Sequence, residues 1–118
     1  MKLNHLNLTV SNVPETRAFL EEYFGLRRIE EAEGDNSFDV MFDDANLVLT
    51  LMKVGESAEV TYPPSFHIGF IQESETKVNE INKRLKDDGF DVKSPKRFHG
   101  SWTFYCKAPG GFTVEVFS

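Results

Sequence analysis

A chain of 118 residues is long enough for one domain with a hydrophobic core of its own. Its content of 40% hydrophobic and 27% charged residues disfavours both disorder and a membrane span. The net charge of −6 disfavours nucleic-acid binding and is compatible with a neutral or cationic small ligand. Since the first residues lack the apolar run of a signal peptide, and Cys106 is the single cysteine, we expect a cytoplasmic protein.

The first half of the chain predicts a strand, a helix and three further strands. Residues 3–10 alternate polar and apolar side chains, as a strand with one apolar face does. A Ser-Asn pair shortly before Pro14 can cap a helix that Gly25 ends. Three strands are then predicted, at residues 26–31, 38–42 and 47–52.

The second half predicts the same order of elements after a connector at 54–64, which carries a glycine and two prolines. A strand at 66–71 precedes a helix that Ser74 can cap and Gly89 can end. Three strands then follow, at residues 91–93, 102–107 and 112–117.

The two halves align with each other in sequence. His5 falls on His67, an offset of 62 residues, and the turn at 43–46 falls on the turn at 108–111, an offset of 65. A repeat of about 60 residues is too long for a solenoid unit, so it indicates a duplicated supersecondary structure.

The order and spacing of these motifs resemble the vicinal oxygen chelate superfamily of glyoxalases, bleomycin resistance proteins and extradiol dioxygenases. The resemblance lies in the strand 5–10 with its Ser-Asn turn, the helix end at 24–26, and the Pro-Gly turn followed by an apolar strand with a glutamate at 109–117. It implies an α+β fold in which two βαβββ modules form a curled mixed sheet around a cavity. Residues 1–118 would be a single glyoxalase-like domain, with modules at 1–53 and 65–118 joined by the linker 54–64.

Strand alternation then predicts which side chains face that cavity. Apolar neighbours suit the helix-packed side, which leaves His5, His67 and Glu115 on the other side. Two imidazoles and a carboxylate form a facial triad that suits divalent Fe, Mn, Zn, Ni or Co and leaves coordination positions open for substrate. We therefore predict that these three side chains converge as metal ligands.

The resemblance also locates a departure from part of the family. Its metal ligands come from the first and last strands of each module, which maps them onto His5, Thr50, His67 and Glu115. Thr50 stands where four-ligand members such as glyoxalase I carry a glutamate. Three protein ligands remain, as in extradiol dioxygenases and fosfomycin-resistance transferases.

Six further residues are candidates for lining a substrate pocket. The competing interpretation is structural, because aromatic side chains on strands usually belong to a core and a loop histidine is usually solvated. The candidates are Asn7, Thr50, Met52, His99, Trp102 and Tyr105.

Two functions follow from this sequence. The first is a metal-dependent enzyme, a lyase, dioxygenase or transferase, acting on a small oxygen-containing substrate chelated to the ion; the sequence assigns it no catalytic residue. The second is a metal-free protein that binds a small molecule or an antibiotic, as bleomycin resistance proteins do. In either case we expect a homodimer, because a small open sheet has edge strands that need covering.

Overall fold

The computed structural model describes residues 1–29, 36–56 and 59–118. These residues form two compact units, the first comprising 1–62 with 109–111 and the second 63–108 with 112–118. The change from one unit to the other along the chain lies within the predicted linker at 54–64. Neither helix in the described ranges has the length and apolar character needed to cross a membrane.

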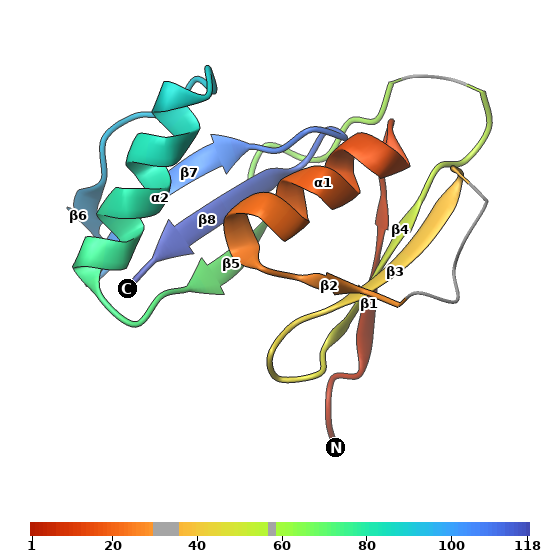
Figure 1. The fold of residues 1–118 in the computed structure, drawn as a ribbon, viewed down its shortest axis with the longest axis horizontal. Coiled ribbons are helices and arrows are strands. Elements are labelled where there is room, and N and C mark those ends of the chain that lie inside the picture. Colours follow the sequence, from red (N-terminus) through yellow and green to blue (C-terminus); the bar gives the residue numbers. More distant parts are fainter. Residues whose placement is uncertain (30–35, 57–58) are drawn as a thin grey trace. The chain divides into compact units, whose positions relative to one another are not determined.

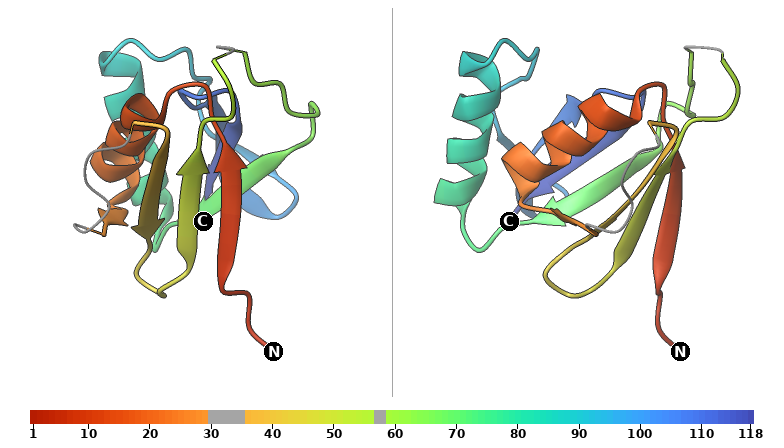
Figure 2. Two further views of the ribbon diagram at one scale, coloured as in Figure 1. Left: turned by 90° about the vertical axis from the view of Figure 1, so that its right-hand side faces the viewer. Right: turned by 45° about the vertical axis from the view of Figure 1, so that its right-hand side comes forward.

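The first unit contains one helix and a four-stranded mixed sheet. The sheet has the order β1-β4-β3-β2, in which β1 and β4 are parallel and the other neighbours are antiparallel (Figures 1 and 2). Its elements are β1 (His5–Thr9), α1 (Val13–Phe24), β2 (Arg27–Arg28), β3 (Phe38–Phe42) and β4 (Val48–Met52).

The second unit repeats this arrangement. Its sheet has the order β5-β8-β7-β6, in which β5 and β8 are parallel and the other neighbours are antiparallel (Figure 1). The elements are β5 (His67–Ile71), α2 (Glu75–Asp87), β6 (Lys96–Phe98), β7 (Ser101–Lys107) and β8 (Thr113–Phe117). The α+β class and the two βαβββ modules are confirmed, although the described strands form two separate sheets and not one continuous sheet.

Two predicted strands differ in extent. The strand expected at 91–93 is wrong: β6 lies at Lys96–Phe98, because Asn82 of α2 donates a hydrogen bond of 2.8 Å to the carbonyl of Lys93 and holds that segment against the helix. The strand expected at 26–31 is reduced to β2, and residues 30 and 31 lie outside the described residues.

The predicted helix caps form as expected. The Asn12 side chain accepts from the backbone N–H of Glu15 at 2.9 Å, which satisfies a donor that the first turn would leave unpaired. Gly25 ends α1 in the left-handed region, with φ of 67°, where an L side chain is disfavoured. Ser74 caps α2 in the same way as Asn12, accepting from Lys77 at 3.2 Å.

Each helix covers one face of the sheet in its own unit. In the first unit Leu20 of α1 is buried with Met41 of β3 and Leu51 of β4. In the second, Leu85 of α2 is buried with Val114 of β8. Strand residues of the other parity, such as His5 and His67, are exposed. The open face of each sheet therefore carries the polar side chains, as the alternation predicts.

A charged side chain lies in the core of the first unit. Asp39 of β3 is fully buried, and its carboxylate oxygens accept from Arg17 at 2.8 Å and from Arg28 at 3.0 Å. The backbone N–H of Val40 donates to it as well, at 2.9 Å. Because a buried charge is tolerated only when it is paired and hydrogen-bonded, Asp39 joins α1, β2 and β3 electrostatically.

We expect Asp39→Asn to lower the free energy of unfolding by about 2–3 kcal/mol, because the two arginines lose their buried counter-charge while the shape is kept. Asp44→Asn is the matched control: its partner is also an arginine, Arg27 at 2.8 Å, but the Asp44 side chain is 95% exposed. That variant should change stability by less than about 0.5 kcal/mol. Urea denaturation measures both, and equal effects would contradict a structural role for Asp39.

Candidate metal site

Strand register brings two of the three predicted ligands together in the second unit. The parallel strands β5 and β8 pair Gly69 with Glu115, and His67 lies two residues before Gly69 on the same face of the sheet. The His67 Nε2 atom is 3.5 Å from Glu115 Oε1. His67 and Glu115 are thus neighbours across adjacent strands, on the face that α2 does not cover.

The other ring nitrogen of His67 determines which tautomer faces the carboxylate. His67 Nδ1 is 3.0 Å from the backbone carbonyl of Ser65, and because a carbonyl can only accept, Nδ1 is the nitrogen that carries the proton. In the neutral ring the Nε2 lone pair is therefore directed at the side of Glu115. A backbone carbonyl that orients an imidazole in this way is typical of metal-binding histidines.

The second carboxylate oxygen of Glu115 is fixed by β7. Thr103 is 1% exposed, and its hydroxyl donates to Glu115 Oε2 at 2.8 Å. The hydroxyl also lies 3.2 Å from the carbonyl of Val116. Because Oε2 accepts the hydrogen bond from Thr103, Oε1 is the carboxylate oxygen that lies near His67.

Tyr105 contacts both His67 and Glu115 on the face of the sheet that α2 does not cover. Its ring meets the His67 ring edge-to-face with centroids 5.4 Å apart, and β7–β8 register places it opposite Glu115. Partial burial, and then the hydrogen bond and negative charge of Glu115, raise the pKa of the Tyr105 hydroxyl above its ordinary value of 10.0. The hydroxyl therefore stays protonated at neutral pH and can donate a hydrogen bond.

Gly69 provides the space in which the cluster sits. A Cβ atom at this position would lie 3.1 Å from the Phe117 ring and 3.8 Å from Glu115 Oε1. A side chain here would press on Phe117 and lie over the carboxylate. The glycine thus leaves the surface above Glu115 accessible.

The equivalent positions of the first unit carry neutral side chains. The β1–β4 register pairs Asn7 with Thr50, just as β5–β8 pairs Gly69 with Glu115, and His5 precedes Asn7 by two residues. The Asn7 amide donates to the Thr50 hydroxyl at 2.6 Å. His5 is exposed, and its Nδ1 lies 2.9 Å from Asn4 Oδ1, which again leaves Nε2 without a hydrogen bond to any residue that the structure describes.

The other predicted pocket residues are distributed over different surfaces. Met52 shares the open face of β4 with Thr50 and is partly buried. His99 lies in the β6–β7 turn with φ of 49° and is exposed, and its ring meets the Phe98 ring edge-to-face with centroids 3.9 Å apart. Trp102 differs from the expectation: its indole Nε1 donates to Asn79 of α2 at 2.8 Å, so it lies on the helix-covered face, opposite Tyr105.

Within the second unit, His67 and Glu115 are suited to bind a divalent ion. Imidazole nitrogen and carboxylate oxygen suit the ions of the predicted list, and an N–O separation of 3.5 Å is close to the roughly 3 Å between neighbouring ligands bound at about 2.1 Å. Neither unit gathers three His, Cys, Asp or Glu side chains around one point among its described residues. His5 as a third ligand is therefore a proposal.

Two groups of this site were missed at the level of sequence. Thr103 shares the parity of Tyr105 on β7, so strand alternation could have placed it on the same face. Gly69 falls on the cavity face by the alternation that places His67 there, but the space it leaves beside Phe117 and Glu115 follows only from the structure. The Ser65 carbonyl had no sequence signal, because it is a backbone group of a connector.

Comparison with known proteins identifies the family of the chain. The family model of the Glyoxalase/Bleomycin resistance protein/Dioxygenase superfamily matches residues 2–116. The fosfomycin resistance protein FosX of Listeria monocytogenes is 33% identical over 99 residues, which are 80% of this chain and 70% of FosX.

Solved structures share the fold over the full chain. A protein of Bacillus cereus described as a possible glyoxalase is 52% identical, with a TM-score of 0.90 and coverage of 100% of this chain and 99% of that one. A lactoylglutathione lyase of Agrobacterium tumefaciens is 20% identical, with a TM-score of 0.75 and coverage of 98% and 92%; it shows the fold alone. The chain belongs to the Glyoxalase/Bleomycin resistance protein/Dioxygenase superfamily.

Proposed function

We propose that this protein is a metal-dependent enzyme that acts on a small oxygen-containing substrate, with His67, Glu115 and His5 as the ligands of a divalent ion. The observation that carries the proposal is the pair formed by His67 Nε2 and Glu115 Oε1, 3.5 Å apart and each oriented by a hydrogen bond on its far side. A lone pair and a carboxylate held side by side are arranged to share a cation.

Each residue of the cluster has a distinct task in this proposal. A bound ion would act as a Lewis acid toward substrate oxygens. Thr103 holds the Glu115 carboxylate at a fixed angle, and the Ser65 carbonyl keeps the His67 ring in the tautomer that offers Nε2. The protonated Tyr105 hydroxyl has one hydrogen to donate, and it can turn this hydrogen bond from Glu115 to a neighbouring substrate oxygen.

The relatives support this choice at the level of the superfamily. FosX is named for resistance to fosfomycin, which is a small-molecule antibiotic. Fosfomycin is therefore the first compound to assay with this protein, in the presence and absence of added divalent metal. The lactoylglutathione lyase supports the fold only.

One observation favours the second candidate, a metal-free protein that binds a small molecule. His67 and Glu115 can form an ion pair without any metal, and the corresponding pair in the first unit, Asn7 and Thr50, is already hydrogen-bonded and neutral. The net charge of −6 would suit a cationic ligand. Metal affinity separates the two candidates.

We expect calorimetric titration with Mn²⁺ or Zn²⁺ to show one site per chain, weakened by more than about tenfold in His67→Ala and in Glu115→Gln. His5→Ala should weaken it similarly if His5 is the third ligand. His99→Ala is the control: this exposed histidine contacts Phe98 in the β6–β7 turn, so the variant should leave the affinity unchanged. Equally weak binding by wild type and His67→Ala would refute the metalloenzyme.

Thr50 gives an independent prediction. Thr50→Ala should change metal affinity by less than about twofold, because a neutral hydroxyl is a poor ligand. Thr50→Glu should tighten binding, since it places a carboxylate where β1–β4 register matches Glu115. Lowering the pH from 7.5 to 5.5 should weaken binding in all three proteins, because protons compete for the imidazoles. Tighter binding by Thr50→Ala would contradict this assignment.

We also propose a cytoplasmic homodimer. Light scattering at micromolar concentration should then give twice the 13.5 kDa of one chain. A stable monomer at high micromolar concentration would contradict the dimer while leaving the His67–Glu115 pair untouched.

A further inference from the structure

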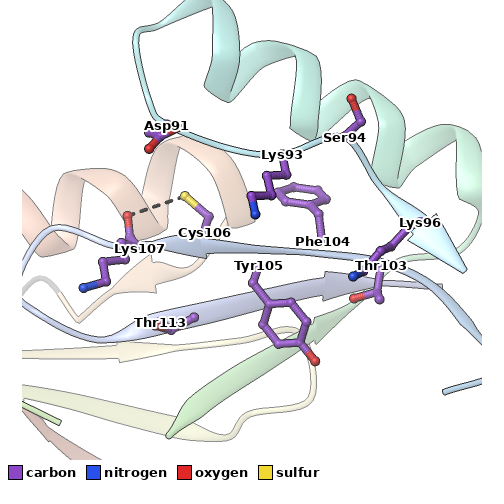
Figure 3. A pocket seen from close by; sticks show the side chains of 10 residues that line it. All are labelled: Asp91, Lys93, Ser94, Lys96, Thr103, Phe104, Tyr105, Cys106, Lys107 and Thr113. Atoms are coloured by element: carbon purple, nitrogen blue, oxygen red, sulfur yellow. Dashed lines mark hydrogen bonds between the residues drawn. The ribbon is translucent and has the colours of Figure 1, made fainter. Parts of the chain in front are cut away.

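A cavity lies at the edge of β7 in the second sheet, and Thr103 and Tyr105 line it as well. A cavity of about 510 Å³ separates the segment 91–96 from β7, within the range of small-ligand pockets. Figure 3 shows its lining, with Phe104, Cys106 and Lys93 on one side of β7 and Thr103 and Tyr105 on the other. We call this space the edge slot.

The edge slot occupies the place where the sequence predicts a strand. Residues 91–93 have alternation suitable for pairing with β7, but the Lys93 carbonyl accepts from Asn82 of α2, and Ser94 accepts from Lys86 at 3.0 Å. Val92 is buried, at 8% exposure. The segment is thereby held by the helix, and pairing with β7 begins only where Lys96 meets Thr103.

Backbone groups of β7 face this slot. Trp102 and Ser118 exchange both backbone hydrogen bonds, so in an antiparallel pair Phe104 and Cys106 also bond toward β8. Tyr105 and Lys107 therefore direct their backbone groups to the opposite edge. The N–H groups of both and the carbonyl of Tyr105 have no hydrogen-bond partner within the described ranges. They form a short unpaired strand edge.

The charge of the edge slot is opposite to that of the chain. Three lysines, Lys93, Lys96 and Lys107, line it against a single aspartate, Asp91, whereas the whole chain carries −6. None of the three lysines forms an ion pair with the residues that the structure describes. The Phe104 side chain, 3% exposed, gives the slot an apolar floor.

We propose that the edge slot binds a short extended acidic peptide segment as an added strand of the second sheet. The alternating N–H and C=O groups of Tyr105 and Lys107 match a peptide backbone, and a simple anion would use only the N–H groups. Two residues of strand span about 7 Å, so the slot takes about three peptide residues. The lysines attract acidic side chains and repel basic ones because of their positive charge.

The test is an NMR titration of the whole ¹⁵N-labelled protein with an acetylated, amidated aspartyl-valyl-aspartate tripeptide. We expect saturable shifts of the Tyr105 and Lys107 amides, with affinity falling severalfold between 20 and 200 mM NaCl. The variant Lys93→Gln/Lys96→Gln should weaken binding at least fivefold. Lys83→Gln on α2 is the matched control, because Lys83 pairs with Asp87 outside the slot and should have no effect.

Two further peptides decide between strand addition and charge attraction alone. The lysyl-valyl-lysine peptide should not bind, and N-methylation of the acidic peptide at its central amide should abolish binding because a backbone donor is lost. Equal binding of the methylated peptide, shifts centred on His67 and Glu115, or no saturable shift would each overturn the proposal. So would Tyr105 and Lys107 shifts that depend on protein concentration alone, which would mean that a second copy occupies the edge.

Discussion

The parallel pairing of β5 with β8 determines the chemistry of the second unit. This register places Glu115 beside Gly69, and because side chains alternate along a strand, the carboxylate reaches the same face as His67. A shift of one residue would turn Glu115 toward α2, into a core formed by Val114 and Val116. The burial of these two valines therefore stabilises the fold and fixes the direction of the carboxylate at the same time.

The duplicated unit shows how one scaffold supports two different polar surfaces. In the first unit His5 lies two residues before Asn7, which pairs with β4, and in the second His67 lies two residues before Gly69, which pairs with β8. The Nδ1 atom of each histidine is hydrogen-bonded. The residue opposite, on the last strand of the unit, is Glu115 in the second unit and Thr50 in the first. With Asn7 in place of Gly69, the first unit satisfies its own polar groups, whereas the second leaves a charged carboxylate next to a lone pair. The proposed metal chemistry rests on this difference.

Most of the fold was predictable because its signals are local. The caps at Asn12, Gly25 and Ser74 depend on neighbouring residues, and the faces of β5 and β8 follow from alternation. The failures have tertiary causes. The segment 91–93 is not a strand because Asn82 of α2 takes the hydrogen bond that pairing would use, and Trp102 turns to Asn79 of α2. The carbonyl of Ser65 orients His67 through a contact that no sequence pattern predicts, and the hydrogen bond from Thr103 to Glu115 depends on the pairing of β7 with β8.

The most direct measurement is anomalous diffraction from crystals grown with Mn²⁺ or Zn²⁺. We expect one strong peak per chain, about 2.0–2.2 Å from His67 Nε2 and Glu115 Oε1, with His5 of the same chain or of a partner as the third protein ligand. Thr103 should still donate to Glu115 Oε2 in that structure. A metal bound elsewhere, or crystals at saturating metal in which His67 and Glu115 form only an ion pair, would contradict the account.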